Sequence, residues 1–104
     1  MVNTTNKTSV PENTAKQNSV LHVVIKSPEE TLYEDKAKAI SSINDVGRFD
    51  VLPSHANFIS LIKDLLIVYG IDDKLWSIKI DSGVLQVHNN EANIFLGIET
   101  LKLK

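Results

Sequence analysis

The sequence predicts an all-β fold, a sandwich or barrel of about eight short strands. Clusters of turn-forming residues recur at roughly eight to twelve residues, the spacing typical of such folds. Between them, apolar and polar residues alternate, most clearly where Trp76, Ile78 and Ile80 are interleaved with polar side chains. The chain has no cysteine, so the predicted core is held by packing alone.

The first half of the predicted fold divides at two turns. Residues 21–25 alternate as a strand and end at Ser27-Pro28-Glu29-Glu30, a turn cluster. Residues 31–34 form a second short extended piece, and residues 37–43 alternate again with their odd-numbered residues on one face. Asn44-Asp45-Val46-Gly47 is a strong turn signal.

The second half contains one ambiguous stretch. Residues 57–70 fit either a helix or two β-rich runs, 58–62 and 65–69, hinged at Lys63-Asp64. The local pattern leaves both structures open.

The remaining segments of the second half are strand-like. Residues 49–52 are short and apolar and stop at Pro53, and residues 76–80 form the clearest strand. Asp81-Ser82-Gly83 is expected to break that strand. Residues 84–87 and 92–98 follow, with a turn between them at 88–91.

The chain of 104 residues allows one domain, preceded by an arm. Residues 1–20 are rich in Asn, Thr, Ser and Lys and have too few apolar side chains to offset the entropy of ordering them. We therefore expect a flexible polar arm at 1–20 and a β-sandwich domain at 21–104. No apolar run approaches the ~20 residues that span a bilayer, and no signal peptide is recognisable.

No catalytic, metal or cofactor site is predicted. His22, His55 and His88 lack the short spacings of metal ligands, and Ser54-His55 are neighbours that point apart in an extended chain. The four glycines form no phosphate-binding loop. A net charge of −2 and scattered basic residues argue against binding to nucleic acid.

Several segments, in order, resemble one family. Gly47-Arg48-Phe49-Asp50-Val51-Leu52-Pro53-Ser54-His55-Ala56 is similar to a Gly-x-Phe/Leu-x-Val/Ile-Leu/Tyr-Pro-Gly-His-Ala stretch of the epsilon subunit of F-type ATP synthase, called delta in mitochondria. Asp81-Ser82-Gly83-Val84-Leu85-Gln86-Val87 and Ala92-Asn93-Ile94-Phe95-Leu96 resemble two later strands of its N-terminal domain. The opening at 21–28 and Leu32-Tyr33-Glu34 match its first two strands, so the resemblance covers about 80 residues.

The resemblance implies a flattened β-sandwich of about eight to ten short strands, and it favours strands over a helix at 57–70. It implies a non-catalytic central-stalk subunit that binds the gamma subunit and the c-ring and couples proton or sodium flow to ATP synthesis. No cofactor is implied, and no obligate homo-oligomer. The expected location is the cytoplasmic face of the inner (plasma) membrane, as a peripheral part of the F1 sector.

The same resemblance suggests roles for individual residues. Arg48, Ser54 and His55 are expected on an outward loop that contacts gamma or the c-ring, because loops on a rigid sandwich are where contacts are made. Structural roles are expected for four further residues. They are Gly47 in a tight turn, Phe49 in the core, Pro53 at the end of a strand and Gly83.

Two departures from the family and two alternatives remain. The family continues into a C-terminal helical hairpin, whereas this sequence stops at Lys104, so a short form without the inhibitory hairpin is expected. Ser54 also replaces the family's glycine. One alternative is a free-standing β-sandwich binding module with a concave pocket instead of an exposed apolar patch. The other is a cupin-type enzyme with the three histidines on a metal.

Overall fold

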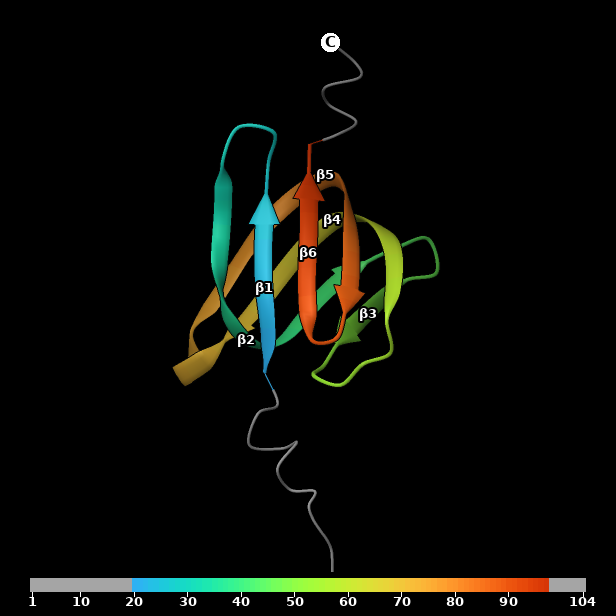
Figure 1. Ribbon diagram of the computed structural model, residues 1–104. Coiled ribbons are helices and arrows are strands. Elements are labelled where there is room, and N and C mark those ends of the chain that lie inside the picture. The colour runs from blue at the N-terminus through green and yellow to red at the C-terminus, as the bar shows by residue number, and fades with distance from the viewer. Residues whose placement is uncertain (1–19, 98–104) are drawn as a thin grey trace, which may run out of the picture.

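The computed structural model describes residues 20–97 as six strands in one continuous sheet that folds over on itself (Figure 1). The order along the sheet is β1-β6-β5-β4-β2-β3, and β1 also pairs with β2. Only β1 and β6 run parallel. The elements are β1 (Leu21–Lys26), β2 (Thr31–Ile43), β3 (Arg48–Val51), β4 (Phe58–Gly70), the 3-10 turn η2 (Ile71–Asp73), β5 (Leu75–His88) and β6 (Glu91–Leu96). The predicted all-β class is confirmed.

The sheet forms two packed layers because β2, β4 and β5 are long enough to pass from one layer into the other. The front layer, nearer the viewer in Figure 1, consists of residues 31–36 of β2, β1, β6, residues 83–88 of β5 and residues 58–62 of β4. The back layer consists of β3, residues 39–43 of β2, residues 64–70 of β4 and residues 75–80 of β5. Five segments face four, which agrees with the predicted eight to ten.

The layers meet at two seams, where the facing edge segments share no backbone ladder among the described residues. We call one the open seam; it lies between residues 31–36 of β2 and residues 75–80 of β5. We call the other the closed seam; it lies between β3 and residues 58–62 of β4. Contacts across both seams are therefore made by side chains and not by hydrogen-bonded strands.

The ambiguous stretch is a strand, as the resemblance implied. β4 is continuous over Phe58–Gly70, with an irregularity between Ile62 and Asp64 and a left-handed backbone at Asp64 (φ 71°). Such a bulge bends a strand and increases its twist. The hinge predicted at Lys63-Asp64 is thus the point at which β4 changes layer.

The expected break at Asp81-Ser82-Gly83 is wrong, because β5 runs unbroken through it. A Cβ on Gly83 would lie 2.7 Å from Leu96 Cδ2 and 2.9 Å from the Phe95 carbonyl oxygen. Gly83 therefore allows β5 to cross closely over β6 where it leaves the front layer. Glycine marks a close approach here, and not the end of a strand.

The predicted phase of β2 is also wrong. Ala37 faces the core, but the register shifts between Ala37 and Ala39, and beyond it Ile40 and Ser42 are on the core side. Ser41 is also buried, but its hydroxyl points to the other face, where it forms hydrogen bonds with Asp50 and Tyr69. An extra residue in a strand reverses the side-chain alternation after it. The short extended pieces predicted at 31–34 and 37–43 are consequently one strand.

The core lies between the two layers and is almost entirely aliphatic. β3 ends before Pro53, as expected, and the apolar Leu52 between them is 56 % exposed and lies outside the core. Phe49 is half-buried. The buried apolar residues are Leu21, Val23, Ile25, Ala37, Ile40, Val51, Ile62, Leu66, Val68, Leu85, Val87, Ala92, Ile94 and Leu96.

The predicted arm, apart from Val20, and the C-terminal end of the predicted domain lie outside the described residues. Within residues 20–97, no helix has the length and apolar character needed to cross a bilayer.

Candidate interaction surface

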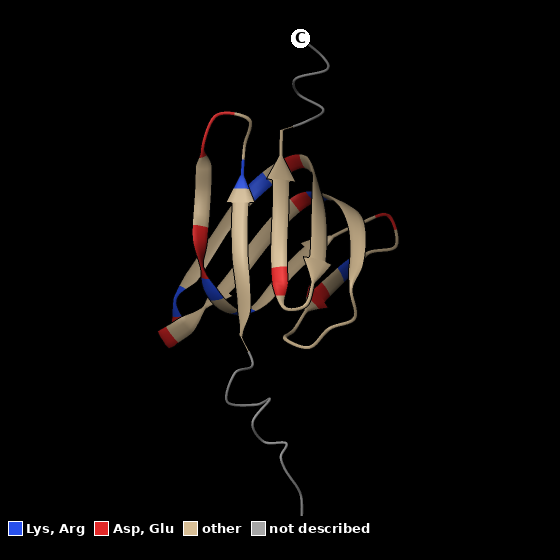
Figure 2. Cartoon of the chain, in the orientation of Figure 1, with Lys and Arg blue, Asp and Glu red and all other residues tan. Residues whose placement is uncertain are grey.

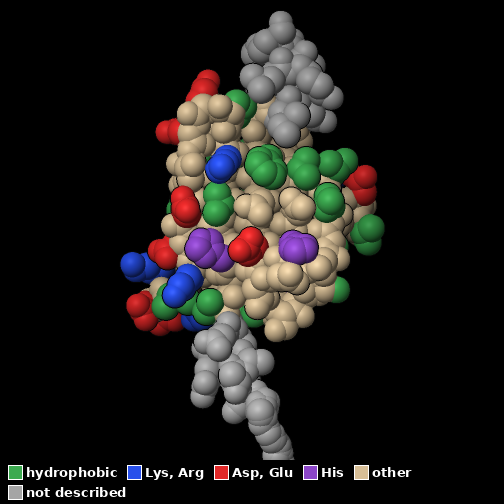
Figure 3. Space-filling model, viewed as in Figure 1, with side chains coloured by type: hydrophobic (Ala, Val, Ile, Leu, Met, Phe, Trp, Pro, Cys, Tyr) green, Lys and Arg blue, Asp and Glu red, His purple; other side chains and the backbone are tan. Residues whose placement is uncertain are grey.

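The outward side of the front layer carries apolar side chains that no described residue covers. Ile59 and Leu61 of β4 are 68 % and 72 % exposed, and Phe95 of β6 is 39 % exposed. Val84 of β5 lies between them, because its register partners are Leu61 and Phe95. We call these four residues the front patch. Figure 3 shows apolar side chains gathered over this part of the layer.

The local sequence explains why the patch exists. In β4, Ile62 faces the core, so Ile59 and Leu61, at odd positions of the same segment, must face outward. Both faces of this segment are therefore apolar. In a strand with one face in water, apolar and polar residues alternate instead. Figure 2 shows charged residues only at the ends of β1 and β6, and residues 83–88 of β5 and 58–62 of β4 carry none, so the middle of the front layer is uncharged.

A polar row lies beside the patch near the β5–β6 turn. Glu91 of β6 is the register partner of both His22 and His88, so the carboxylate sits between two imidazoles on the exposed surface. His55 lies elsewhere, with its ring against Phe58. Among residues 20–97, no group of three or more His, Cys, Asp or Glu side chains has a geometry that could hold a metal ion.

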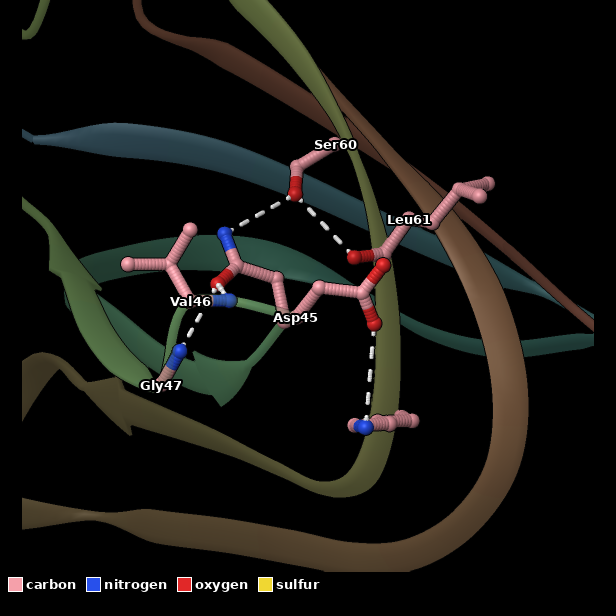
Figure 4. A network of polar contacts seen from close by, with 7 residues as sticks. Asp45, Val46, Gly47, Ser60 and Leu61 are labelled. Atoms are coloured by element: carbon pink, nitrogen blue, oxygen red, sulfur yellow. Dashed lines mark hydrogen bonds and ion pairs between the residues drawn. The ribbon is translucent and has the colours of Figure 1, made fainter.

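The predicted turn at 44–47 is held close to β4 (Figure 4). The Asn44 Oδ1 accepts hydrogen bonds from the backbone N–H groups of Val46 (2.9 Å) and Gly47 (3.2 Å), and the Asn44 side-chain amide donates to Ser60 Oγ (3.2 Å). Lys63 Nζ lies 3.7 Å from Asp45 Oδ1. The turn thereby presents Val46, 95 % exposed, next to the strand that carries the front patch.

Gly47 has the positive φ that the sequence predicted for this turn, at 140°. An L-residue with a side chain rarely adopts such a backbone, and Gly47 closes the turn by exchanging backbone hydrogen bonds with Asn44 at 3.0 and 3.1 Å.

The predicted contact residues are not brought together as one loop. Ser54 and His55 lie in the β3–β4 connection, where the Ser54 N–H donates to Asn90 Oδ1 (2.6 Å). The His55 ring packs on Phe58 at 4.8 Å between centroids. Arg48 instead begins β3, and its Nη2 donates to the Tyr69 hydroxyl (3.4 Å). Ser54 and His55 thus sit beside the β5–β6 turn, whereas Arg48 lies on the outer side of the back layer.

A pocket of about 320 Å³ lies in the open seam. Trp76 and Tyr33 form its aromatic wall, with ring centroids 5.5 Å apart. Burial raises the pKa of the Tyr33 hydroxyl, and the nearby Asp35 carboxylate raises it further. Alternation along residues 76–80 indicated a strand but gave no sign that Trp76 would line a pocket. The front patch was not predicted because residues 57–70 were ambiguous.

Comparison with known proteins gives the family. The model of the ATP synthase delta/epsilon chain β-sandwich domain matches residues 20–97. The chain belongs to this family. The epsilon chain of Nitratiruptor sp. is 34 % identical over 73 residues, covering 69 % of this chain and 57 % of that protein. The epsilon chain of Clostridium botulinum strain Eklund 17B is 32 % identical over 72 residues, covering 68 % and 54 %.

The solved structures show the same sandwich in ATP synthases. The chain aligns with a subunit in the Euglena gracilis mitochondrial ATP synthase (OSCP/F1/c-ring) with a TM-score of 0.69 and 18 % identity, covering 74 % of this chain and 50 % of that one. A subunit of the Tetrahymena thermophila central stalk and c-ring aligns with a TM-score of 0.61 and 12 % identity, covering 73 % and 62 %. At these identities the alignments show the shared fold. The chain spans little more than half the length of these epsilon-chain relatives.

Proposed function

We propose that this epsilon-type sandwich is a non-catalytic central-stalk subunit of an F-type ATP synthase, which binds the gamma subunit and the c-ring and helps to couple ion flow to ATP synthesis. The observation that carries the proposal is the front patch, because an exposed apolar patch on a small domain marks a site of protein–protein contact. Its three most exposed members, Ile59, Leu61 and Phe95, leave large apolar side chains in water.

Gamma is the partner that we assign to the front patch. The centre of a stable interface is apolar and depleted in charge, with a polar rim. The patch has this arrangement: its centre at Leu61, Val84 and Phe95 is uncharged, and the row of His22, Glu91 and His88 lies to one side.

The c-ring is assigned to the β3–β4 connection. Ser54 and His55 are exposed there and are held in place by Asn90 and Phe58. A loop that is fixed by such contacts loses little conformational freedom on binding. Arg48, on the back layer, is a separate contact in this proposal. The complex would hold the subunit at the cytoplasmic face of the membrane as a peripheral part of the F1 sector.

The alternative from the sequence, a free-standing binding module, predicts a pocket in place of a patch. The described residues contain both features. The patch and the family together favour the stalk subunit, since a free-standing monomer gains nothing from leaving Ile59 and Leu61 in water.

Cross-linking tests the proposal directly, because the chain has no cysteine and single-cysteine variants are unambiguous. A photoreactive maleimide is attached to Leu61→Cys, Ser54→Cys or Asp72→Cys in the assembled synthase. We expect Leu61→Cys to cross-link to gamma and Ser54→Cys to the c-ring. Asp72→Cys, exposed in η2 at the end of β4 that is distant from Leu61, is the control and should give neither product.

Two outcomes would overturn the proposal. One is the clean absence of the subunit from the purified synthase. The other is its presence with no cross-link from Leu61→Cys to gamma.

A further inference from the structure

The open seam leaves an entrance to the pocket between two edges of the sandwich. Residues 31–36 of β2 pair only with β1, and residues 75–80 of β5 pair only with β4. The pocket lies where these two edges face each other, at the η2 end of the molecule. Its lining residues are Tyr33, Asp35, Val68, Gly70, Lys74, Leu75 and Trp76.

The walls of the pocket are mainly aromatic and apolar. The rings of Tyr33 and Trp76 are tilted by 53° with centroids 5.5 Å apart, and both side chains are only half-buried. Part of each ring is therefore accessible from the pocket. The face of an aromatic ring attracts cations, and tryptophan does so most strongly.

The rim of the pocket carries a carboxylate. Asp35 is exposed, and none of the ion pairs between described residues uses it. Its Oδ1 accepts a hydrogen bond from the Lys36 N–H at 2.7 Å, which leaves further acceptor sites free. The Asp35 charge also acts on the Tyr33 hydroxyl, where it adds to burial in raising the pKa. Negative potential thus reaches the aromatic wall.

We infer that this pocket binds the cationic side chain of an extended segment of a protein partner, with the guanidinium or ammonium group between Trp76, Tyr33 and the Asp35 carboxylate. The combination of aromatic faces with a carboxylate is one that suits such a cation. A protein segment is the source, because the free edge of β5 beside the pocket offers unpaired backbone groups to a neighbouring strand.

Lys74 makes it possible to test the sign of the charge that the pocket binds. It lines the same pocket and is exposed, so its ammonium group opposes a bound cation and would favour a bound anion. Neutralising Asp35 should weaken the binding of a cation, whereas neutralising Lys74 should strengthen it. A pocket that binds through shape alone would respond to neither change.

Trp76 provides the readout, since it is the only tryptophan and its indole N–H gives a single signal in the ¹⁵N–¹H correlation spectrum of the full chain. The probe is a capped peptide with one arginine between valines. It is compared with the same peptide containing citrulline, the neutral isostere, and with capped free arginine. We expect saturable shifts with a Kd of about 1 mM for the arginine peptide and about tenfold weaker binding of the citrulline peptide.

The variants complete the experiment. Asp35→Asn should weaken the arginine peptide about tenfold and Lys74→Gln should tighten it about threefold. Asp45→Asn, exposed at the opposite side of the sandwich, is the matched control and should change nothing. Equal binding of the citrulline peptide, or an unchanged affinity in Asp35→Asn, overturns the inference. Free arginine that binds as tightly as the peptide overturns the assignment to a protein segment.

Discussion

The two seams of the sandwich differ in how side chains cover the gap between the layers. In the closed seam, Phe49 of β3 meets Phe58 of β4 edge to face, with centroids 6.2 Å apart, and the His55 ring covers Phe58. In the open seam, Tyr33 meets Trp76 and a pocket remains beside them.

The difference follows from the chain path. The edges of the closed seam are consecutive strands, so their own connection, which includes His55, folds over the gap. That connection is tied to the β5–β6 turn by Asn90 Oδ1 and by the hydrogen bond from the Asn89 N–H to Asn57 Oδ1 (2.9 Å). The edges of the open seam are distant in sequence, and no connection is available to fill the gap between them. Sequence proximity therefore determines which seam is sealed.

Truncating one aromatic residue in each seam gives the largest expected difference. Phe58→Ala should lower the free energy of unfolding by about 3 kcal/mol, because it removes contacts with Phe49 and His55 in a filled region. Trp76→Ala should cost less, about 1.5–2 kcal/mol, because the space that it vacates joins a pocket already open to water. Urea denaturation of both variants measures the difference. A larger loss for Trp76→Ala would show that the open seam is the better packed of the two.

Adding one methylene group should have opposite effects near the two seams. Val68 is buried and lines the pocket, so Val68→Ile has space to enter and should stabilise the domain by about 0.5 kcal/mol. Val51, buried on β3, does not line this pocket, and Val51→Ile should destabilise the domain by about 1 kcal/mol because an added methylene overpacks a filled core. Thermal unfolding of the pair tests the contrast. Changes of the same sign in both variants would contradict it.

The smallest effect is confined to alkaline pH. Burial and Asp35 raise the pKa of Tyr33 in the folded state, so stability from this group is fully present below the unfolded pKa of about 10 and is lost as the pH rises toward the folded value. Between pH 9 and 11, the unfolding free energy of the natural chain should therefore fall relative to that of Tyr33→Phe. Urea titrations across that range measure it, and a pH-independent difference would contradict it.

Much of the fold could be predicted from the sequence, because strands and turns are local. The turns at 27–30, 44–47 and 88–91 are where Pro, Asn and Gly indicated them. The predictions were wrong for the strands that pass from one layer into the other. The phase of β2 after Lys38 and the continuity of β5 through Gly83 depend on contacts with other strands, which alternation along one segment does not encode.

The interaction surface was less predictable than the fold. The resemblance implied an apolar patch but did not identify its members, because Leu61, Val84 and Phe95 become neighbours only through the register of three strands. Likewise, Arg48 and His55 are close in sequence but lie on different sides of the domain. A signal for the patch was nevertheless present in the sequence. The run around Ile59 and Leu61 is apolar at both odd and even positions, whereas a strand with one buried face needs apolar residues only at alternate positions.

The passage of β2, β4 and β5 through both layers has a mechanical consequence. Sandwich layers that are joined only by side chains can shear past one another under load. Here a force applied at Leu61 travels along the covalent backbone of β4, through the bend at Asp64, into the back layer. The two layers are therefore joined by the backbones of three strands, and a force applied to one layer is transmitted to the other through covalent bonds.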